Sequence, residues 1–172
     1  MNQDRQLYTD SHEEFSSKLK ISGVNPYVDV PDQVVERLGD RKRIPVLVKL
    51  INPLAKGNSS ILERDAEHLK AIGRLTDGNW FRTTFVPMRS EPTRLYLDKW
   101  MRETSNVSIG DSVQIILKID SGSRELEIPL VLSKALAEND QAANAWMALS
   151  FSRRREILTY LNLLKTQKAL ER

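Results

Sequence analysis

The feature that most constrains the fold is a run in which every second residue is a large aliphatic one. The run comprises Val113, Ile115, Leu117 and Ile119, and two of the three residues between them are polar. Successive side chains of a β-strand point to opposite faces of its sheet, so this alternation predicts a strand with one buried face. A lone strand cannot bury that face, and the rest of the chain must supply a sheet around it.

Further alternating or short apolar runs predict strands at residues 15–21, 27–30, 44–51, 80–88, 94–97 and 124–130. Turn-forming residues bound most of these runs, and the last run follows the hairpin signal Asp120-Ser121-Gly122-Ser123. About six strands that are joined in part by short helices indicate a small closed or half-closed β-barrel.

A helix is predicted over about residues 60–72, between two of these strands. Ser60 and Glu63 have the spacing of a capping box, in which both side chains satisfy free backbone amides. Shorter helices are predicted over residues 31–39 and 98–103. We expect the helix at 60–72 to be an insertion into the barrel.

After Pro129 the periodicity changes from that of strands to that of helices. Residues 135–149 are rich in Ala and predict helix with a break near Asn139-Asp140, and Ser150 or Ser152 is expected to cap a final helix. The apolar residues of that final helix are Ile157, Leu158, Leu161 and Leu164.

The sequence therefore predicts an α+β protein that is mainly β and has two segments. A small β-barrel domain covers residues 14–130 and includes the inserted helix at about 60–72. A C-terminal helical segment covers residues 131–172. The length of 172 residues, with 40% apolar and 28% charged residues, fits an ordinary globular domain with a small appendage.

The absence of cysteine bears on both chemistry and compartment. It excludes disulfides, thiolate nucleophiles and cysteine-based metal sites. No apolar run approaches the roughly 18 residues that a membrane span needs. No apolar stretch follows the charged N-terminus, so no secretory signal is predicted. We expect a cytoplasmic protein.

The net charge of +3 is unevenly distributed. From residue 134 onward seven Lys and Arg accompany four Asp and Glu, whereas the rest of the chain carries 19 of each kind. A small positive excess in a helical segment is compatible with an anionic partner, although nucleic-acid-binding domains usually have a denser basic patch.

Few residues suit acid–base or metal chemistry. His12 lies beside Glu13 and Glu14 and is more typical of a solvated charge cluster than of a metal site. His68 is expected on the exposed face of the inserted helix. No zinc-ligand spacing, catalytic-serine motif or Gly-rich phosphate loop occurs, so we predict no catalytic residue, no metal and no cofactor.

A cationic and aromatic cluster is the strongest candidate for a ligand site. Its predicted ligand-binding residues are Trp80, Arg82, Thr84, Arg89 and Arg94. A guanidinium beside a hydroxyl and an aromatic ring can hold a carboxylate, a phosphate or a stacked base. The alternative is that these arginines lie along the barrel surface and pair with nearby acids, namely Glu91, Asp98 and Glu103.

A second candidate is the run Arg153, Arg154 and Arg155 near the start of the final helix. The helix dipole disfavours positive charge at this end, so three arginines there need a reason. A phosphate-rich partner is one reason. Pairing with acids of the barrel, which would dock the helical segment, is the reason we prefer.

Short motifs also give a family resemblance. In chain order they are Tyr27-Val28-Asp29-Val30-Pro31, Ile44-Pro45-Val46, Phe81-Arg82-Thr83-Thr84 and Gly110-Asp111-Ser112-Val113. These motifs resemble the small β-barrel domain of unknown function found in many bacteria. The residues from Leu136 through Trp146 to Ser152-Arg153-Arg154-Arg155-Glu156 and Lys165-Thr166 resemble the segment called bacteriocin-protection, YdeI or OmpD-associated.

These two segments occur in tandem in that family, so the resemblance covers most of residues 14–168. It implies a double-split β-barrel, a fold that some DNA-binding regulators and antitoxins share. It implies no catalytic residue, because the family has no established activity. The chain departs from the family in the helix at about 60–72 and in a tail without the usual Arg-rich ending.

Three functions follow, in order of preference. The first is a binding or interaction module for an anionic small molecule or a protein partner, without insertion into a membrane. The second is a nucleic-acid-binding or regulatory protein that uses the basic tail. The third is an enzyme with an unrecognised carboxylate site at Asp29, Asp32 and Glu36, three acids that otherwise complement the dipole of the first helix.

Overall fold

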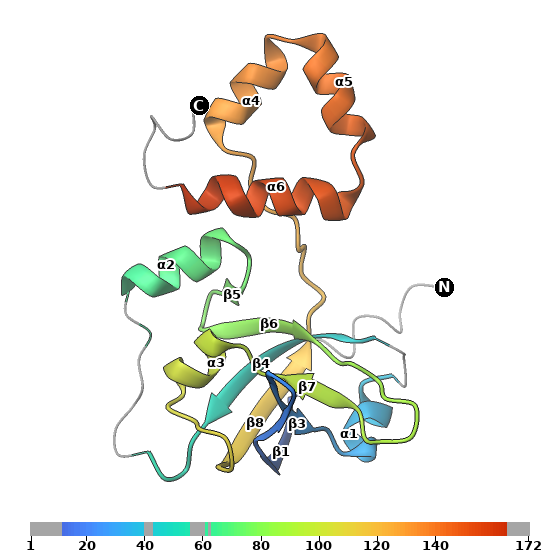
Figure 1. Ribbon diagram of the computed structural model, residues 1–172, viewed down its shortest axis with the longest axis vertical. Helices are drawn as coiled ribbons and strands as arrows, with labels where there is room; N and C mark the ends of the chain where they lie inside the picture. Colours follow the sequence, from blue (N-terminus) through green and yellow to red (C-terminus); the bar gives the residue numbers. More distant parts are fainter. Residues whose placement is uncertain (1–11, 40–42, 56–60, 62, 165–172) are drawn as a thin grey trace. The chain divides into compact units, whose positions relative to one another are not determined.

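The computed structural model describes residues 12–39, 43–55, 61 and 63–164 (Figure 1). Contacts between Cα atoms divide the chain into two units. The β-unit takes its described residues from 1–62 and 76–122, and the helical unit takes its described residues from 63–75 and 123–172.

The larger sheet has the strand order β1-β8-β4-β6-β5. Its strands are β1 (Glu13–Lys18), β8 (Ser112–Ile119), β4 (Pro45–Ile51), β6 (Trp80–Thr84) and β5 (Leu75–Thr76). β8 pairs antiparallel with β1 on one side and with β4 on the other, and β4 pairs antiparallel with β6. The buried face predicted from the alternation in β8 is confirmed for Val113, Ile115 and Leu117, which are fully buried, whereas Ile119 is half-buried.

A smaller sheet contains β2 (Lys20–Ser22), β3 (Asn25–Asp29) and β7 (Arg94–Tyr96). Two sets of backbone hydrogen bonds connect it to the larger sheet. Leu19, between β1 and β2, donates to the Asp111 carbonyl at 2.9 Å and accepts from Gly110 at 2.8 Å. Val86, just after β6, exchanges two hydrogen bonds of 2.9 Å with Arg94 of β7. Backbone hydrogen bonds thus connect the two sheets at two places, as in a small barrel. The predicted α+β fold class is confirmed.

Inward side chains of both sheets form the core of the β-unit. The fully buried aliphatic residues of the strands include Val28, Val46, Val48, Leu95, Val113, Ile115 and Leu117. Two short helices, α1 (Asp32–Arg37) and α3 (Lys99–Thr104), add Val34 and Met101 to the buried set. The Asp98 carboxylate begins α3 by accepting the backbone N–H of Met101 at 2.9 Å.

The strand predicted at residues 124–130 is wrong. Residues 123–129 form no regular element, and α4 begins at Leu130. The hairpin would have required this segment to pair with β8, but β1 and β4 already occupy both edges of β8. The alternation of Leu126 and Ile128 therefore belongs to a connecting segment that leaves the sheet.

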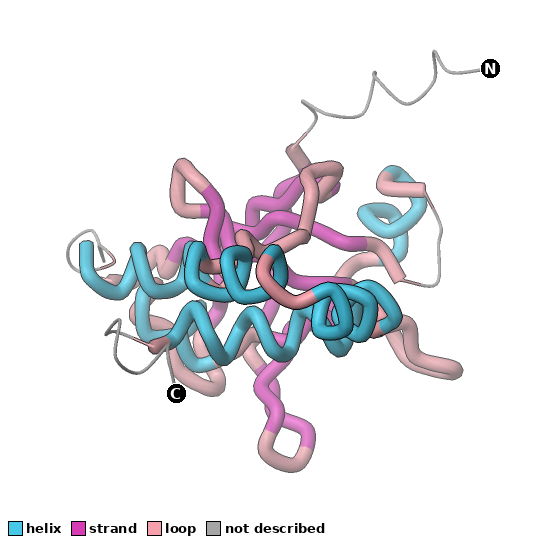
Figure 2. The backbone as a smooth tube through the Cα atoms, turned by 90° about the horizontal axis from the view of Figure 1, so that it is seen from above, coloured by secondary structure: helices cyan, strands magenta, loops and turns pink. Residues whose placement is uncertain are grey.

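The helical unit contains α2 (Glu63–Ala71), α4 (Leu130–Ala137), α5 (Asp140–Ala148) and α6 (Phe151–Leu163). In Figure 1, α4, α5 and α6 follow one another as three sides of a triangle, and they are among the cyan helices of Figure 2. The side chain of Asn139 caps α5, and that of Ser150 caps α6. The predicted break near Asn139-Asp140 is confirmed, and Ser150 rather than Ser152 begins the last helix.

The inserted helix is present as α2, and it belongs to the helical unit. Asn162 of α6 donates hydrogen bonds of 3.3 Å to the carbonyls of Ala71 and Glu127. The predicted cap of this helix, Ser60, lies outside the described residues. The helical unit is therefore built from two separate stretches of chain.

None of the helices that the structure describes has the length and apolar character needed to cross a bilayer.

Candidate functional site

The predicted residues Trp80, Arg82 and Thr84 lie at alternate positions of β6 and share one face of the sheet. The Arg82 Nε lies 3.5 Å from the Asp120 carboxylate, whose side chain is fully buried at the end of β8. The charge of Arg82 is therefore compensated within the β-unit. Asp120 was not among the acids predicted to pair with the arginines, because it comes from a strand 38 positions further along the chain.

The other two predicted residues, Arg89 and Arg94, lie in and after the segment that connects β6 with β7. Arg94 is buried, forms an ion pair with Glu91 and lies over the ring of Tyr27 at 4.2 Å. This pairing with Glu91 is the one that the alternative interpretation predicted. Arg89 is exposed. The role of this cluster in ligand binding stays a prediction.

The ring of Trp80 has neighbours that sequence reasoning missed. The ammonium groups of Lys49 on β4 and Lys118 on β8 lie 4.6 and 4.9 Å from its centroid. The imidazole of His12, expected in a solvated cluster, is stacked on the indole at 5.3 Å with an interplanar angle of 28°. The signal that could have found both lysines is their outward position between the buried residues of alternating strands.

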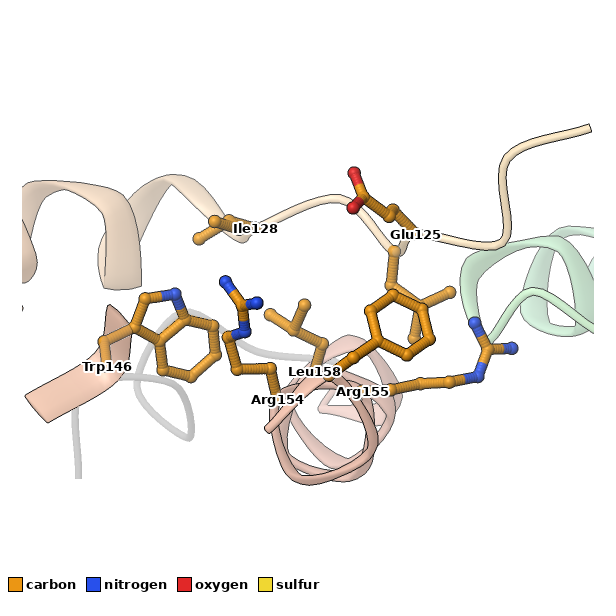
Figure 3. A pocket seen from close by; sticks show the side chains of 8 residues that line it. Glu125, Ile128, Trp146, Arg154, Arg155 and Leu158 are labelled. Carbon is orange, nitrogen blue, oxygen red and sulfur yellow. The ribbon is translucent and has the colours of Figure 1, made fainter. Parts of the chain in front are cut away.

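The helical unit contains a hollow of about 430 Å³, a volume that includes the open solvent at its mouth (Figure 3). The connecting segment, α5 and the first turns of α6 form its walls. The apolar lining residues are Leu126, Ile128, Trp146, Phe151 and Leu158, and the charged ones are Glu125, Arg154 and Arg155. An apolar hollow with a few charged groups is typical of a small-molecule site.

The hollow uses one face of α6. Positions 151, 154, 155 and 158 are spaced by three and four residues, so their side chains project from the same side of the helix. The Ser150 hydroxyl fixes where this face begins, because it accepts the backbone N–H of Arg153 at 3.3 Å and caps α6. Leu158 is buried at the base of the face, whereas Phe151 is half exposed.

The three predicted arginines of α6 have different surroundings. Arg153 forms an exposed ion pair of 2.6 Å with Glu156, within its own helix. Arg155 donates a hydrogen bond to the Arg124 carbonyl, and its guanidinium is directed away from Trp146 (Figure 3). The preferred prediction, that this run pairs with acids of the barrel, stays a prediction.

Arg154 differs from both of its neighbours. Its side chain is half-buried and forms no ion pair or hydrogen bond among the residues that the structure describes. Figure 3 shows its guanidinium between the indole of Trp146 and Leu158, extending toward Ile128. The carboxylate of Glu125 lies at the other side of the hollow. Among the described residues that line the hollow, Arg154 is thus the cation that neither an acid nor a carbonyl holds.

The carboxylates considered for catalysis lie on and before α1. Asp29 forms an ion pair of 2.5 Å with Lys20, and this hydrogen-bonded carboxylate raises the pKa of the lysine. Asp32 lies in the first turn of α1, where it complements the helix dipole, and both Asp32 and Glu36 are exposed. Within the described ranges, no group of three or more His, Cys, Asp or Glu residues is placed to hold a metal ion.

All eight residues that line the hollow fall in one stretch that can be compared with known families. Residues 125–172 match the family Bacteriocin-protection, YdeI or OmpD-Associated. The resemblance seen in the sequence of the OmpD-associated segment is confirmed, and a small β-rich domain precedes the segment. The family is one of unknown function. No curated protein matches the chain significantly in sequence.

Proposed function

We propose that this protein is a binding module for a small organic anion, and that the hollow of the helical unit is its site. The observation that carries the proposal is Arg154, a half-buried guanidinium among apolar side chains that has no anion beside it among the described residues. A partly dehydrated cation gains from an acceptor that approaches it, because a charge-assisted hydrogen bond replaces lost hydration.

The position of the hollow at the start of α6 favours an anion further. The N-terminal end of a helix carries partial positive charge, and the arginines of this turn add to it. Arg153 is offset by Glu156, and Arg155 is held by a backbone carbonyl, so Arg154 is the group left to meet a ligand. A single guanidinium suits one carboxylate, which it can bind through two parallel hydrogen bonds.

The walls of the hollow restrict the rest of the ligand. Trp146, Phe151 and Leu158 offer apolar and aromatic surface, which favours a ligand with an apolar or aromatic body. The enclosed part of the hollow measures about 100 Å³, which is below the range of about 300–1,000 Å³ for ligand sites and admits only a small ligand. Glu125 at its side disfavours a second negative charge. The ligand class proposed is therefore a small monocarboxylate with an apolar body.

This proposal is tested by NMR titration of the whole protein with phenylacetate and with hexanoate. Shifts of the Trp146 indole N–H and of backbone amides at the start of α6 should report binding. Arg154→Gln should raise the Kd at least about tenfold, which corresponds to about 1.4 kcal/mol. Its matched control, Arg153→Gln, removes the same charge one residue earlier and should leave the Kd unchanged.

The neutral amide phenylacetamide serves as a second control, because it keeps the apolar body and lacks the charge. On the wild type, the amide should bind more weakly than phenylacetate. On Arg154→Gln, the acid and the amide should bind with the same Kd. The same Kd for wild type and Arg154→Gln, or for the acid and its amide, would show that Arg154 does not bind an anion.

A further inference from the structure

The outer face of the larger sheet carries a second cationic and aromatic cluster, which we call the Trp80 face. It consists of His12, Lys49, Trp80 and Lys118. The three strands β8, β4 and β6 are adjacent in the sheet. Their inward residues Leu117, Val48 and Phe81 are buried and paired in register. A sequence neighbour of each buried residue therefore points outward: Lys118 follows Leu117, Lys49 follows Val48, and Trp80 precedes Phe81.

The two lysines of the Trp80 face keep their charge available. Neither Lys49 nor Lys118 has an acidic partner or a hydrogen bond among the described residues; each contacts only the indole, at 4.6 and 4.9 Å. A cation above an aromatic ring is attracted to the ring without being neutralised by it. Arg82 on the same face is different, because the buried Asp120 compensates it. Two positive charges thus flank one half-buried ring.

His12 shows that a planar ring has room to stack on Trp80. Its imidazole lies 5.3 Å from the indole, the two planes are within 28° of each other, and His12 itself is exposed. A ligand with a flat ring can take the place of this imidazole. The ammonium groups of Lys49 and Lys118 then lie where anionic substituents of the ligand's ring would be.

We propose that the Trp80 face binds a nucleotide unit, with the base stacked on Trp80 in place of His12 and the phosphate held by Lys49 and Lys118. A base supplies the flat ring, and a phosphate is the anion that lysine binds as a point charge. Stacking on one aromatic ring is tolerant of sequence, because every base has a π-face. A duplex keeps its bases stacked inside, so it cannot offer one to Trp80.

Two sources can supply this chemistry, a free nucleotide and a nucleotide within a single strand. The experiment titrates the full-length protein at low salt with AMP, with an oligothymidylate of about eight residues, and with a duplex of the same length. Binding is followed by calorimetry. If AMP and the single strand bind with equal affinity per site, the ligand is the free nucleotide. If the single strand binds much more tightly than AMP, the ligand is single-stranded nucleic acid. The duplex should bind most weakly.

Variants assign the binding to the Trp80 face. Trp80→Ala should weaken binding of the single strand about tenfold, and Trp80→Phe should keep most of it. Lys49→Gln and Lys118→Gln should each lower the slope of log K against log salt, and the double variant should lower it by about 0.7, the value expected for one phosphate contact in a single strand. The matched control Lys99→Gln, an exposed lysine of the β-unit that pairs with Glu103, should not change that slope.

His12→Ala should tighten binding, because the base no longer displaces the imidazole. The proposal is overturned if the wild type binds neither AMP nor the single strand, or if Trp80→Ala and both lysine variants bind as the wild type does. It is also overturned if the duplex binds as tightly as the single strand. Arg154→Gln should leave nucleotide binding unchanged, so this site and the carboxylate site fail or succeed separately.

Discussion

The basic residues of the β-unit differ in whether an acid accompanies them. Arg82 pairs with Asp120 and Arg94 with Glu91, whereas the ammonium groups of Lys49 and Lys118 contact only an aromatic ring among the described residues. Paired arginines hold the fold together, and cations without an anion are the ones available to a ligand. Within the β-unit, this difference moves the candidate anion site from Arg82 and Arg94 to Lys49 and Lys118.

The ion pair of Arg82 with Asp120 gives a prediction about stability. Asp120→Asn removes the charge of a fully buried carboxylate while the Arg82 guanidinium stays largely buried, so we expect the free energy of unfolding to fall by about 2 kcal/mol. Urea denaturation measures the change. Glu103→Gln, in the exposed pair with Lys99, should change the free energy by no more than about 0.5 kcal/mol. Equal effects at both positions would show that burial of the acid is unimportant.

At the scale of single elements, the Ser150 cap fixes where α6, the helix that lines the hollow, begins. Ser150 accepts the N–H of Arg153, and the face that lines the hollow begins at the next residue, Phe151. Ser150→Ala should therefore lower the free energy of unfolding by about 1 kcal/mol, as measured by thermal or urea denaturation. Ser152→Ala removes an identical hydroxyl from the first turn, and we expect no measurable loss. A larger loss for Ser152→Ala would reassign the cap.

The end of α2 offers a comparison between two glycines with similar backbone angles. Gly73 has φ +65°, and a Cβ there would lie 2.7 Å from Leu126 and 3.1 Å from the guanidinium of Arg155. Gly23 has φ +60° and nothing within 4 Å of the same position. Gly23→Ala should cost about 1 kcal/mol of strain, and Gly73→Ala should cost about 1–3 kcal/mol more because of overpacking. Equal losses of unfolding free energy would mean that Leu126 moves aside freely.

For the whole molecule, the helical unit depends on two stretches of chain. α4 and α5 contain no buried residue and α6 contains one, Leu158, whereas Leu69 of α2 is fully buried. Isolated helices of this length are marginal in water. A fragment of residues 123–172 should therefore show little helix by circular dichroism. A peptide of residues 63–75 added to it should raise the helical signal, and a scrambled peptide should not. Full helicity of the fragment alone would contradict this.

Sequence patterns predicted the elements whose signal is local. The alternation in β8, the break at Asn139-Asp140 and the inserted helix each depend on neighbours within a few residues. The wrongly predicted strand at 124–130 shows what a local pattern cannot reveal. Its alternation is typical of a strand, but β1 and β4 already pair with both edges of β8.

The candidate site residues also divide into those with a local sequence signal and those that depend on long-range contacts. Arg154 was found from a local run of charge, but its isolation from Arg153 and Arg155 depends on what each guanidinium contacts. Lys49 and Lys118 were missed because they meet Trp80 only through the order of three strands that lie far apart in the chain. Cross-strand neighbours of this kind are not visible until the register is known.

The membership of α2 in the helical unit restricts which segments of such genes can be exchanged by recombination. A recombination event that transferred only the coding sequence for residues 123–172 would deliver Asn162 without the Ala71 carbonyl that it binds. We therefore expect that a chain with this insertion can exchange its C-terminal segment only for one from another chain that carries the insertion.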